Sequence, residues 1–80
     1  MATLTLIGRT YCHLCDDMRL AAEPLLEEFG VDLLWVDADA DPGLEVRYGE
    51  RVPVLLHGET ELCHYFMDVA KVRDYLSKIG

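Results

Sequence analysis

The stretch T-L-T-L-I-G-R-T-Y-C-H-L-C-D-D, residues 3–17, decides the fold of this chain. It begins with a β-type run that ends at Gly8, and it passes into a helical pattern that opens with Cys12 and Cys15. A thiol at the start of a helix lies beside unpaired backbone N–H groups and the positive end of the helix dipole, which stabilise its thiolate. Because the thiolate is the reacting species, this placement predicts a reactive cysteine pair.

Two cysteines three positions apart serve either as a redox-active dithiol or as half of a zinc site. The zinc alternative would add Cys63 and His64 as ligands. Successive strand residues point to opposite faces, so at most one of these two side chains is expected near the pair. The position between a strand and a helix therefore favours the dithiol, and Cys63 is interpreted as a small buried apolar residue.

Size and charge limit the class of protein. The chain has 80 residues, 51% of them hydrophobic, and its 7 basic and 15 acidic side chains give a net charge of −8. One domain over residues 1–80 is expected, and the acidic balance argues against nucleic acid or a membrane surface as partner. No apolar run approaches the roughly 20 residues of a membrane helix, and the N-terminus does not resemble a signal peptide. We therefore expect a cytoplasmic protein, and a monomer.

Strands and helices are predicted to alternate. Apolar and β-branched runs predict strands over residues 3–8, 31–36, 52–56 and 61–64. Helices are predicted over residues 13–29, from Asp41-Pro42 to near Gly49, and after Asp68 as the capping residue. The order β-α-β-α-β-β-α combines a right-handed βαβ unit with a hairpin and a final helix. It predicts an α/β domain with one mixed four-stranded sheet covered by helices.

The helices carry further local signals. Gly30 is expected to end the first helix as its C-cap, and Pro24 is expected to kink or break it. Apolar spacing predicts that the first helix buries Leu14, Met18, Ala21, Leu25 and Phe29. The same spacing predicts that the final helix buries Val69, Val72, Leu76 and Ile79.

This element order, with the cysteine pair at the first junction and Val52-Pro53 at the third strand, resembles the thioredoxin fold in its compact glutaredoxin form. Small bacterial glutaredoxin-like proteins carry Tyr-Cys-His-Leu-Cys-Asp, here residues 11–16, and Tyr-Gly-x-x-Val-Pro-Val, here residues 48–54. The resemblance covers essentially the whole chain. It implies a thiol–disulfide oxidoreductase that reduces protein or small-molecule disulfides, in electron transport and cell redox homeostasis.

The resemblance also implies roles for single residues. Cys12 would be the attacking thiolate, and Cys15 the resolving thiol that releases the mixed disulfide. Pro53 would follow a cis peptide bond and face the pair, which leaves the Val52 backbone free to pair with an extended substrate. No bound cofactor or metal is implied, and electrons would come from glutathione or a reductase.

Three residues around the pair have two interpretations each. Arg9 either favours the thiolate and holds a glutathione carboxylate, or is a solvated charge at the strand end. Tyr11 either lines the substrate groove or covers the sheet edge. His13 either steadies the thiolate when protonated, or is a solvated residue of the first helical turn.

The chain departs from the glutaredoxin pattern in two places. No proline separates the cysteines, and residues 62–68 lack the Gly-Gly pair that glutathione-binding members place after the fourth strand. Asp68 matches the acidic position that follows those glycines. Two alternatives therefore remain: a low-turnover module that binds a protein strand along Val52-Pro53, and a zinc or iron–sulfur protein.

Overall fold

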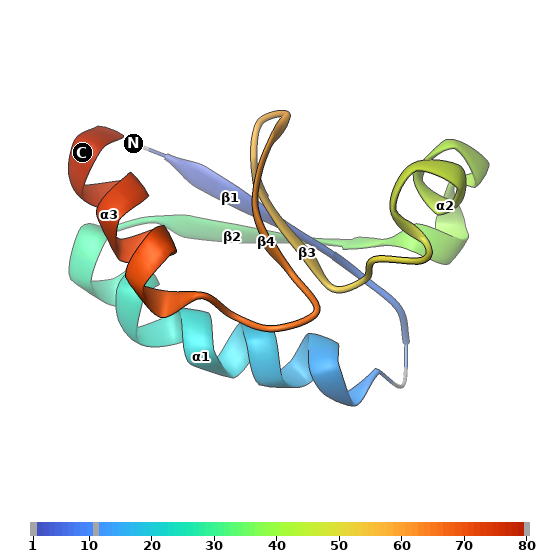
Figure 1. The fold of residues 1–80 in the computed structure, drawn as a ribbon, viewed down its shortest axis with the longest axis horizontal. Helices are drawn as coiled ribbons and strands as arrows, with labels where there is room; N and C mark the ends of the chain where they lie inside the picture. The colour runs from blue at the N-terminus through green and yellow to red at the C-terminus, as the bar shows by residue number, and fades with distance from the viewer. Residues whose placement is uncertain (1, 11, 80) are drawn as a thin grey trace.

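The computed structural model describes residues 2–10 and 12–79. The elements are β1 (Thr3–Gly8), α1 (His13–Phe29), β2 (Asp32–Asp37), the 3₁₀ helix η1 (Ala38–Ala40), α2 (Pro42–Tyr48), β3 (Val54–His57), β4 (Thr60–His64) and α3 (Val69–Ile79). The predicted order is confirmed, with η1 as an addition (Figure 1). None of the helices in this described part of the chain is long and apolar enough to cross a membrane.

The sheet has the strand order β2-β1-β3-β4. β1 runs parallel to β2 and antiparallel to β3, and β3 pairs antiparallel with β4. This is the predicted mixed sheet with a βαβ unit and a hairpin. The third strand begins two residues later than predicted, at Val54, because Pro53 has no N–H to donate to a ladder.

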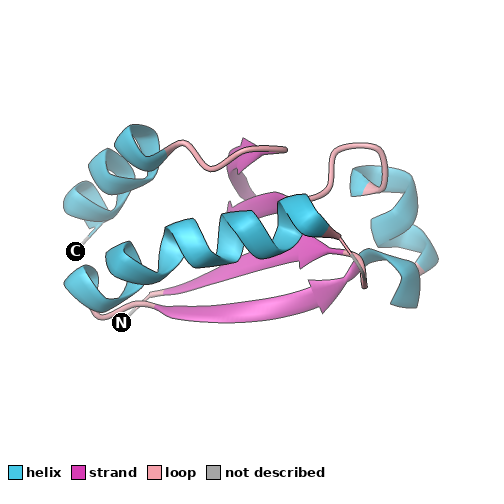
Figure 2. Ribbon diagram, turned by 90° about the horizontal axis from the view of Figure 1, so that it is seen from below, coloured by secondary structure: helices cyan, strands magenta, loops and turns pink. Residues whose placement is uncertain are grey.

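The sheet separates two apolar clusters, because β1 alternates its side chains between its faces. Leu4 and Leu6 belong to the larger cluster, which α1 and α3 cover, and Ile7 belongs to the smaller one beneath η1 and α2. Figure 2 shows α1 lying along the strands, with α2 at the opposite end from α3. The larger cluster contains Leu4, Leu6, Met18, Leu25, Leu55, Leu62, Cys63, Val72 and Leu76.

The prediction of which face of α1 is buried is partly wrong. Met18 and Leu25 are buried as expected, but Leu14 is 37% exposed, and the other buried residues of the helix are Cys15 and Ala22. These four positions also follow a spacing of three and four. Cysteine behaves here as a small apolar residue, so the buried face begins at Cys15 rather than at Leu14.

Pro24 does not break α1, which continues to Phe29. Because Pro24 has no N–H, the Leu20 carbonyl lacks its hydrogen-bond donor within the helix. Both residues lie on the exposed side of the helix, where water can donate to this carbonyl instead. The prediction for Gly30 is confirmed. It has a left-handed conformation with φ of 64°, and its N–H donates to the Leu26 carbonyl.

The predicted caps of the two later helices are also confirmed. Asp41 Oδ1 accepts the Gly43 N–H at 2.8 Å, and Asp68 Oδ1 accepts the Lys71 N–H at 3.0 Å. α3 buries Val72 and Leu76, whereas the two outer residues of its predicted face, Val69 and Ile79, are 43% and 41% exposed.

Candidate functional site

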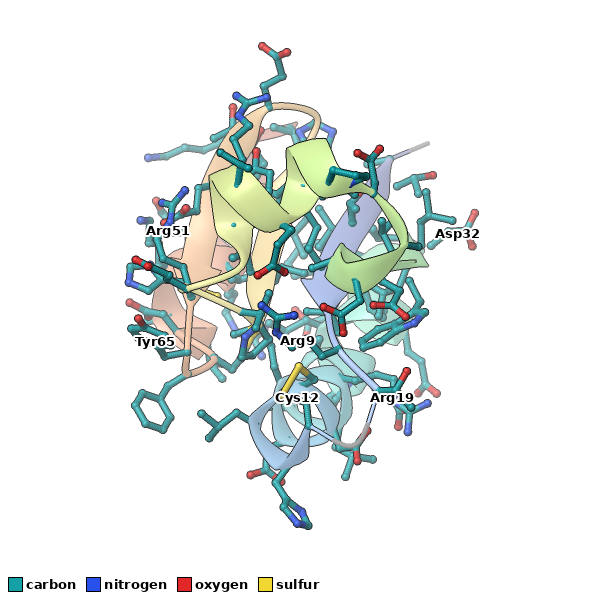
Figure 3. All side chains as sticks on the ribbon, turned by 90° about the vertical axis from the view of Figure 1, so that its right-hand side faces the viewer. Arg9, Cys12, Arg19, Asp32, Arg51 and Tyr65 are labelled. Carbon is teal, nitrogen blue, oxygen red and sulfur yellow. A yellow bond between two sulfur atoms is a disulfide. The ribbon has the colours of Figure 1, made fainter. Side chains whose placement is uncertain are left out.

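The cysteine pair lies where β1 passes into α1. Cys12 is the N-cap residue of α1, with extended backbone angles, and Cys15 lies in the first turn. Their side chains form a disulfide, drawn in yellow in Figure 3, and their Cα atoms are 5.2 Å apart. Cys12 Sγ accepts a hydrogen bond from the Cys15 N–H at 3.1 Å. When the pair is reduced, this donor and the helix N-terminus favour negative charge on Cys12.

The two sulfurs differ in access to solvent. Cys15 is 1% exposed, whereas Cys12 is only half-buried. An incoming molecule therefore meets Cys12 first, and Cys15 lies beneath it, one turn into the helix. This asymmetry is what an attacking thiol and a resolving thiol require.

Gly8 makes room for the inner sulfur. A Cβ on Gly8 would lie 2.7 Å from Cys15 Sγ and 2.6 Å from Cη2 of Trp35, closer than any ordinary contact. The sequence marks Gly8 only as the end of a strand, and it gives Trp35 no role. The available signal is alternation along β1. It places Gly8 on the same sheet face as Leu4 and Leu6, which is the face that α1 covers.

The peptide bond between Val52 and Pro53 is cis, as the resemblance implies. Pro53 is buried and Val52 is half-buried. The Tyr65 N–H donates to the Pro53 carbonyl at 2.9 Å, and the Tyr65 hydroxyl donates to the Glu50 carbonyl at 2.6 Å. Tyr65 thus ties the turn after β4 to the segment before β3.

Tyr65 is a site residue that sequence reasoning missed. Its φ of 63° lies in the left-handed region that bulky residues rarely adopt. The two hydrogen bonds offset this unfavourable backbone conformation. A tyrosine gives no sequence signal for positive φ, so only the structure places it there.

Arg9 is ion-paired at the end of β1, with its side chain still 30% exposed. Its guanidinium contacts Asp39, pairs with Glu45 at 2.7 Å and donates to the Gly49 carbonyl at 3.0 Å. The hydrogen bond with Glu45, together with the nearby carboxylates, raises the pKa of Arg9. Figure 3 draws Arg9 between the disulfide and α2. These bonds join the end of β1 to η1 and α2.

The other predicted site residues have separate surroundings. His13 is exposed at the first position of α1, and Tyr11 lies outside the described residues. Asp68 lines a surface hollow of about 640 Å³ together with Phe66 and residues of β4. Within residues 2–10 and 12–79, neither cysteine of the pair lines that hollow.

The four residues of the zinc alternative are not brought together. Cys63 is buried in the larger cluster, and this burial raises the pKa of its thiol. His64 Nδ1 instead pairs with Glu61 Oε2 at 2.9 Å on the exposed side of β4. In the part of the chain that the structure describes, no group of three or more His, Cys, Asp or Glu side chains is arranged to hold a metal ion.

Comparisons with known proteins agree with this geometry. The model of the Glutaredoxin-like domain (DUF836) matches residues 3–77. Protein Ne2328 from Nitrosomonas europaea is 36% identical with a TM-score of 0.83, covering 92% of this chain and 89% of its own. Protein XcR50 from X. campestris is 38% identical with a TM-score of 0.70, covering 94% of this chain and 96% of its own.

Thioredoxin 1 from Thermosipho africanus shares the fold alone, with 16% identity and a TM-score of 0.66 over 96% of this chain and 92% of its own. The glutaredoxin-like fold and the adjacent Cys12 and Cys15 support a redox-type function in general terms. Since the family model spans nearly the whole chain, this protein belongs to the glutaredoxin-like domain family and has a thioredoxin fold.

Proposed function

We propose that this protein is a thiol–disulfide oxidoreductase that uses Cys12 and Cys15 to reduce disulfides of proteins or small molecules. One observation carries the proposal: a half-buried Cys12 sulfur at a helix N-terminus lies above a buried Cys15, with Cα atoms 5.2 Å apart. That separation suits both the dithiol and the disulfide without backbone movement. The proposal rests on this site, because a thioredoxin fold alone does not specify an activity.

In the first step, the Cys12 thiolate attacks one sulfur of a substrate R–S–S–R′. A Cys12–S–S–R bond forms, the substrate disulfide breaks, and R′ leaves as a thiolate that takes a proton from water. The helix N-terminus and the Cys15 N–H stabilise the attacking Cys12 thiolate before this step.

In the second step, Cys15 loses its proton and its thiolate attacks the Cys12 sulfur. The Cys12–Cys15 disulfide forms and R leaves as a thiolate, so two electrons have passed from the protein to the substrate. Two glutathione molecules or one dithiol reductase return these electrons. Glutathione is then a reductant or substrate in solution, and the cycle needs no bound cofactor.

The residues around the pair have proposed roles in binding. The backbone of Val52, beside Pro53, pairs with an extended segment of a protein substrate. His13, exposed at the first position of α1, faces the approaching molecule beside Cys12. We place the reaction in the cytoplasm, where dithiols are kept reduced, and in a monomer.

A redox titration against glutathione tests the proposal. We expect a reversible two-electron transition of the Cys12–Cys15 pair at about −270 to −200 mV. Thiol trapping and mass spectrometry measure the oxidised fraction at each potential. Cys63→Ala is the matched control, because it removes the buried third cysteine and leaves the transition in place.

A Cys15→Ser variant separates the two steps. It should accumulate a mixed disulfide on Cys12, because the first step proceeds and the second cannot. If no Cys12–Cys15 disulfide forms anywhere in the titration, the dithiol mechanism is wrong. Binding of protein strands without turnover then becomes the better explanation of the site.

A further inference from the structure

Trp35 lies on β2, at the edge of the sheet, and is the only tryptophan of the chain. Trp35 pairs in register with Leu6 of β1, and Gly8, two residues after Leu6, pairs with Asp37. Leu33, two residues earlier on the same strand, packs against the larger apolar cluster. Because side chains alternate along a strand, Trp35 faces the same side of the sheet as Leu33, toward α1.

The far edge of the indole and the inner sulfur of the redox pair both approach Gly8. Cη2 and Cζ3 of Trp35 lie 2.6 Å and 2.9 Å from the point that a Cβ on Gly8 would occupy, and Cys15 Sγ lies 2.7 Å from the same point. The ring edge and the sulfur therefore share the space above Gly8. Contacts between sulfur and an aromatic ring edge are favourable.

The indole also borders solvent. Trp35 is 44% exposed, and with Asp16 and Arg19 of α1 it lines a surface hollow of about 210 Å³. Cys15, which neighbours Asp16 in α1, is 1% exposed. The indole thus borders both this hollow and the space beside Gly8 into which the buried sulfur also projects.

We propose that Trp35 is a positioning residue of the redox pair, which closes the outer side of Cys15 so that external thiols and disulfides react only at Cys12. This inference rests on the proposed function. An accessible Cys15 thiolate would attack R–S–S–R′ itself, forming a Cys15–S–S–R bond and releasing R′ as a thiolate. That product places the mixed disulfide on the wrong cysteine, and the indole prevents it.

The first test measures access to Cys15 directly. In a Cys12→Ser background, iodoacetamide alkylation of Cys15 is followed by peptide mass spectrometry, which distinguishes Cys15 from Cys63. We expect Trp35→Ala to accelerate alkylation of Cys15 by about tenfold or more, because reactivity of a buried group follows its accessibility. The matched control is Leu34→Ala, which removes a 54% exposed neighbour on the other face of β2 and should leave the rate unchanged.

A second variant keeps the test decisive if Trp35→Ala does not fold. Trp35→Leu keeps an apolar side chain on β2 but is too short to reach the space above Gly8, so it should also accelerate alkylation. Equal Cys15 alkylation rates in the Cys12→Ser parent protein and in the same protein with either folded Trp35 substitution would overturn the proposal. Acceleration of Cys63 alkylation to the same degree would also overturn it, because that result indicates general loosening of the fold.

Fluorescence gives an independent readout of the proximity of the indole to the redox pair. A disulfide quenches an excited indole that it contacts, and all tryptophan emission of this chain comes from Trp35. We expect emission to rise when the Cys12–Cys15 disulfide is reduced, and to be insensitive to the reductant in Cys15→Ser. Unchanged emission on reduction would contradict the contact.

These readouts separate the two proposals. The alkylation assay uses a protein without Cys12, so it tests the shield even if the redox titration fails to show a dithiol cycle. Conversely, the expected redox transition together with equal Cys15 alkylation rates would support the proposed oxidoreductase and contradict only the role of Trp35.

Discussion

Replacing Gly8 with alanine tests the packing that surrounds the inner sulfur. The new Cβ would lie 2.6 Å from Trp35 Cη2 and 2.7 Å from Cys15 Sγ, whereas carbon atoms prefer a separation of about 3.5–4.0 Å. Trp35 is 44% exposed, so its ring can relieve the first clash by moving outward, but this movement gives up its present packing. Cys15 is buried and held by both α1 and the disulfide, so the second clash remains.

The expected cost in free energy of unfolding is that of overpacking, about 1–3 kcal/mol. For a domain of this size, each kcal/mol lowers Tm by roughly 4–8 °C. Urea unfolding of the oxidised proteins, followed by far-UV circular dichroism, measures this cost. Gly43→Ala is the matched control, because its nearest contact would be Asp41 Oδ1 at 3.2 Å and alanine favours the helix there.

A double-mutant cycle identifies the cause of the loss. Because the indole accounts for one of the two clashes, Gly8→Ala should cost less in a Trp35→Ala background. The difference is expected within the range of about 0.5–3 kcal/mol that contacting residues show. An unchanged urea midpoint for Gly8→Ala, or an equal cost in both backgrounds, would refute the reasoning.

Three further predictions concern the surroundings of the site. Asp68→Ala removes the acceptor of the Lys71 N–H and should lower stability by about 0.5–2 kcal/mol in thermal unfolding, whereas Asp68→Asn should retain most of it. Tyr65→Phe removes the hydrogen bond to the Glu50 carbonyl, and urea unfolding should show a loss of about 0.5–1.5 kcal/mol, with no loss contradicting the contact. Burial raises the pKa of the Cys63 thiol, so the unfolded chain loses this proton at a lower pH than the folded protein. Stability should therefore fall as the pH rises beyond the ordinary thiol value of about 8.5, and the same pH series with Cys63→Ala should lack this component.

Local signals account for the parts of the fold that were predicted correctly. Asp41, Asp68 and Gly30 act on backbone groups within four residues of themselves, so their roles can be deduced from short stretches. The order of strands and helices follows in the same way from hydrophobic patterns. The expectation of a cis bond before Pro53 rested on the family resemblance, because composition alone favours the trans form.

The missed features depend on contacts between distant segments. Arg9 bonds to residues 30 to 40 positions away, and no pattern in one sequence states which carboxylates will meet it. Trp35 and Cys15 approach the same space beside Gly8 only because β1 and β2 pair in one register and Gly8 has no side chain. The buried face of α1 was misplaced for a related reason, since the packing of its first turn follows from the position of Cys15 above the sheet.

The ion pairs of Arg9 leave little positive potential beside Cys12. Asp39 and Glu45 offset its charge locally, so it attracts little over a Debye length of about 8–10 Å. The net charge of −8 then dominates the field around an approaching molecule. With the proposed function, we expect an anionic thiol to be repelled and to meet the protein faster as ionic strength rises, and a cationic disulfide peptide to be attracted and to slow down as salt is added. On this expectation, long-range steering favours cationic over anionic reactants before either makes contact with the protein.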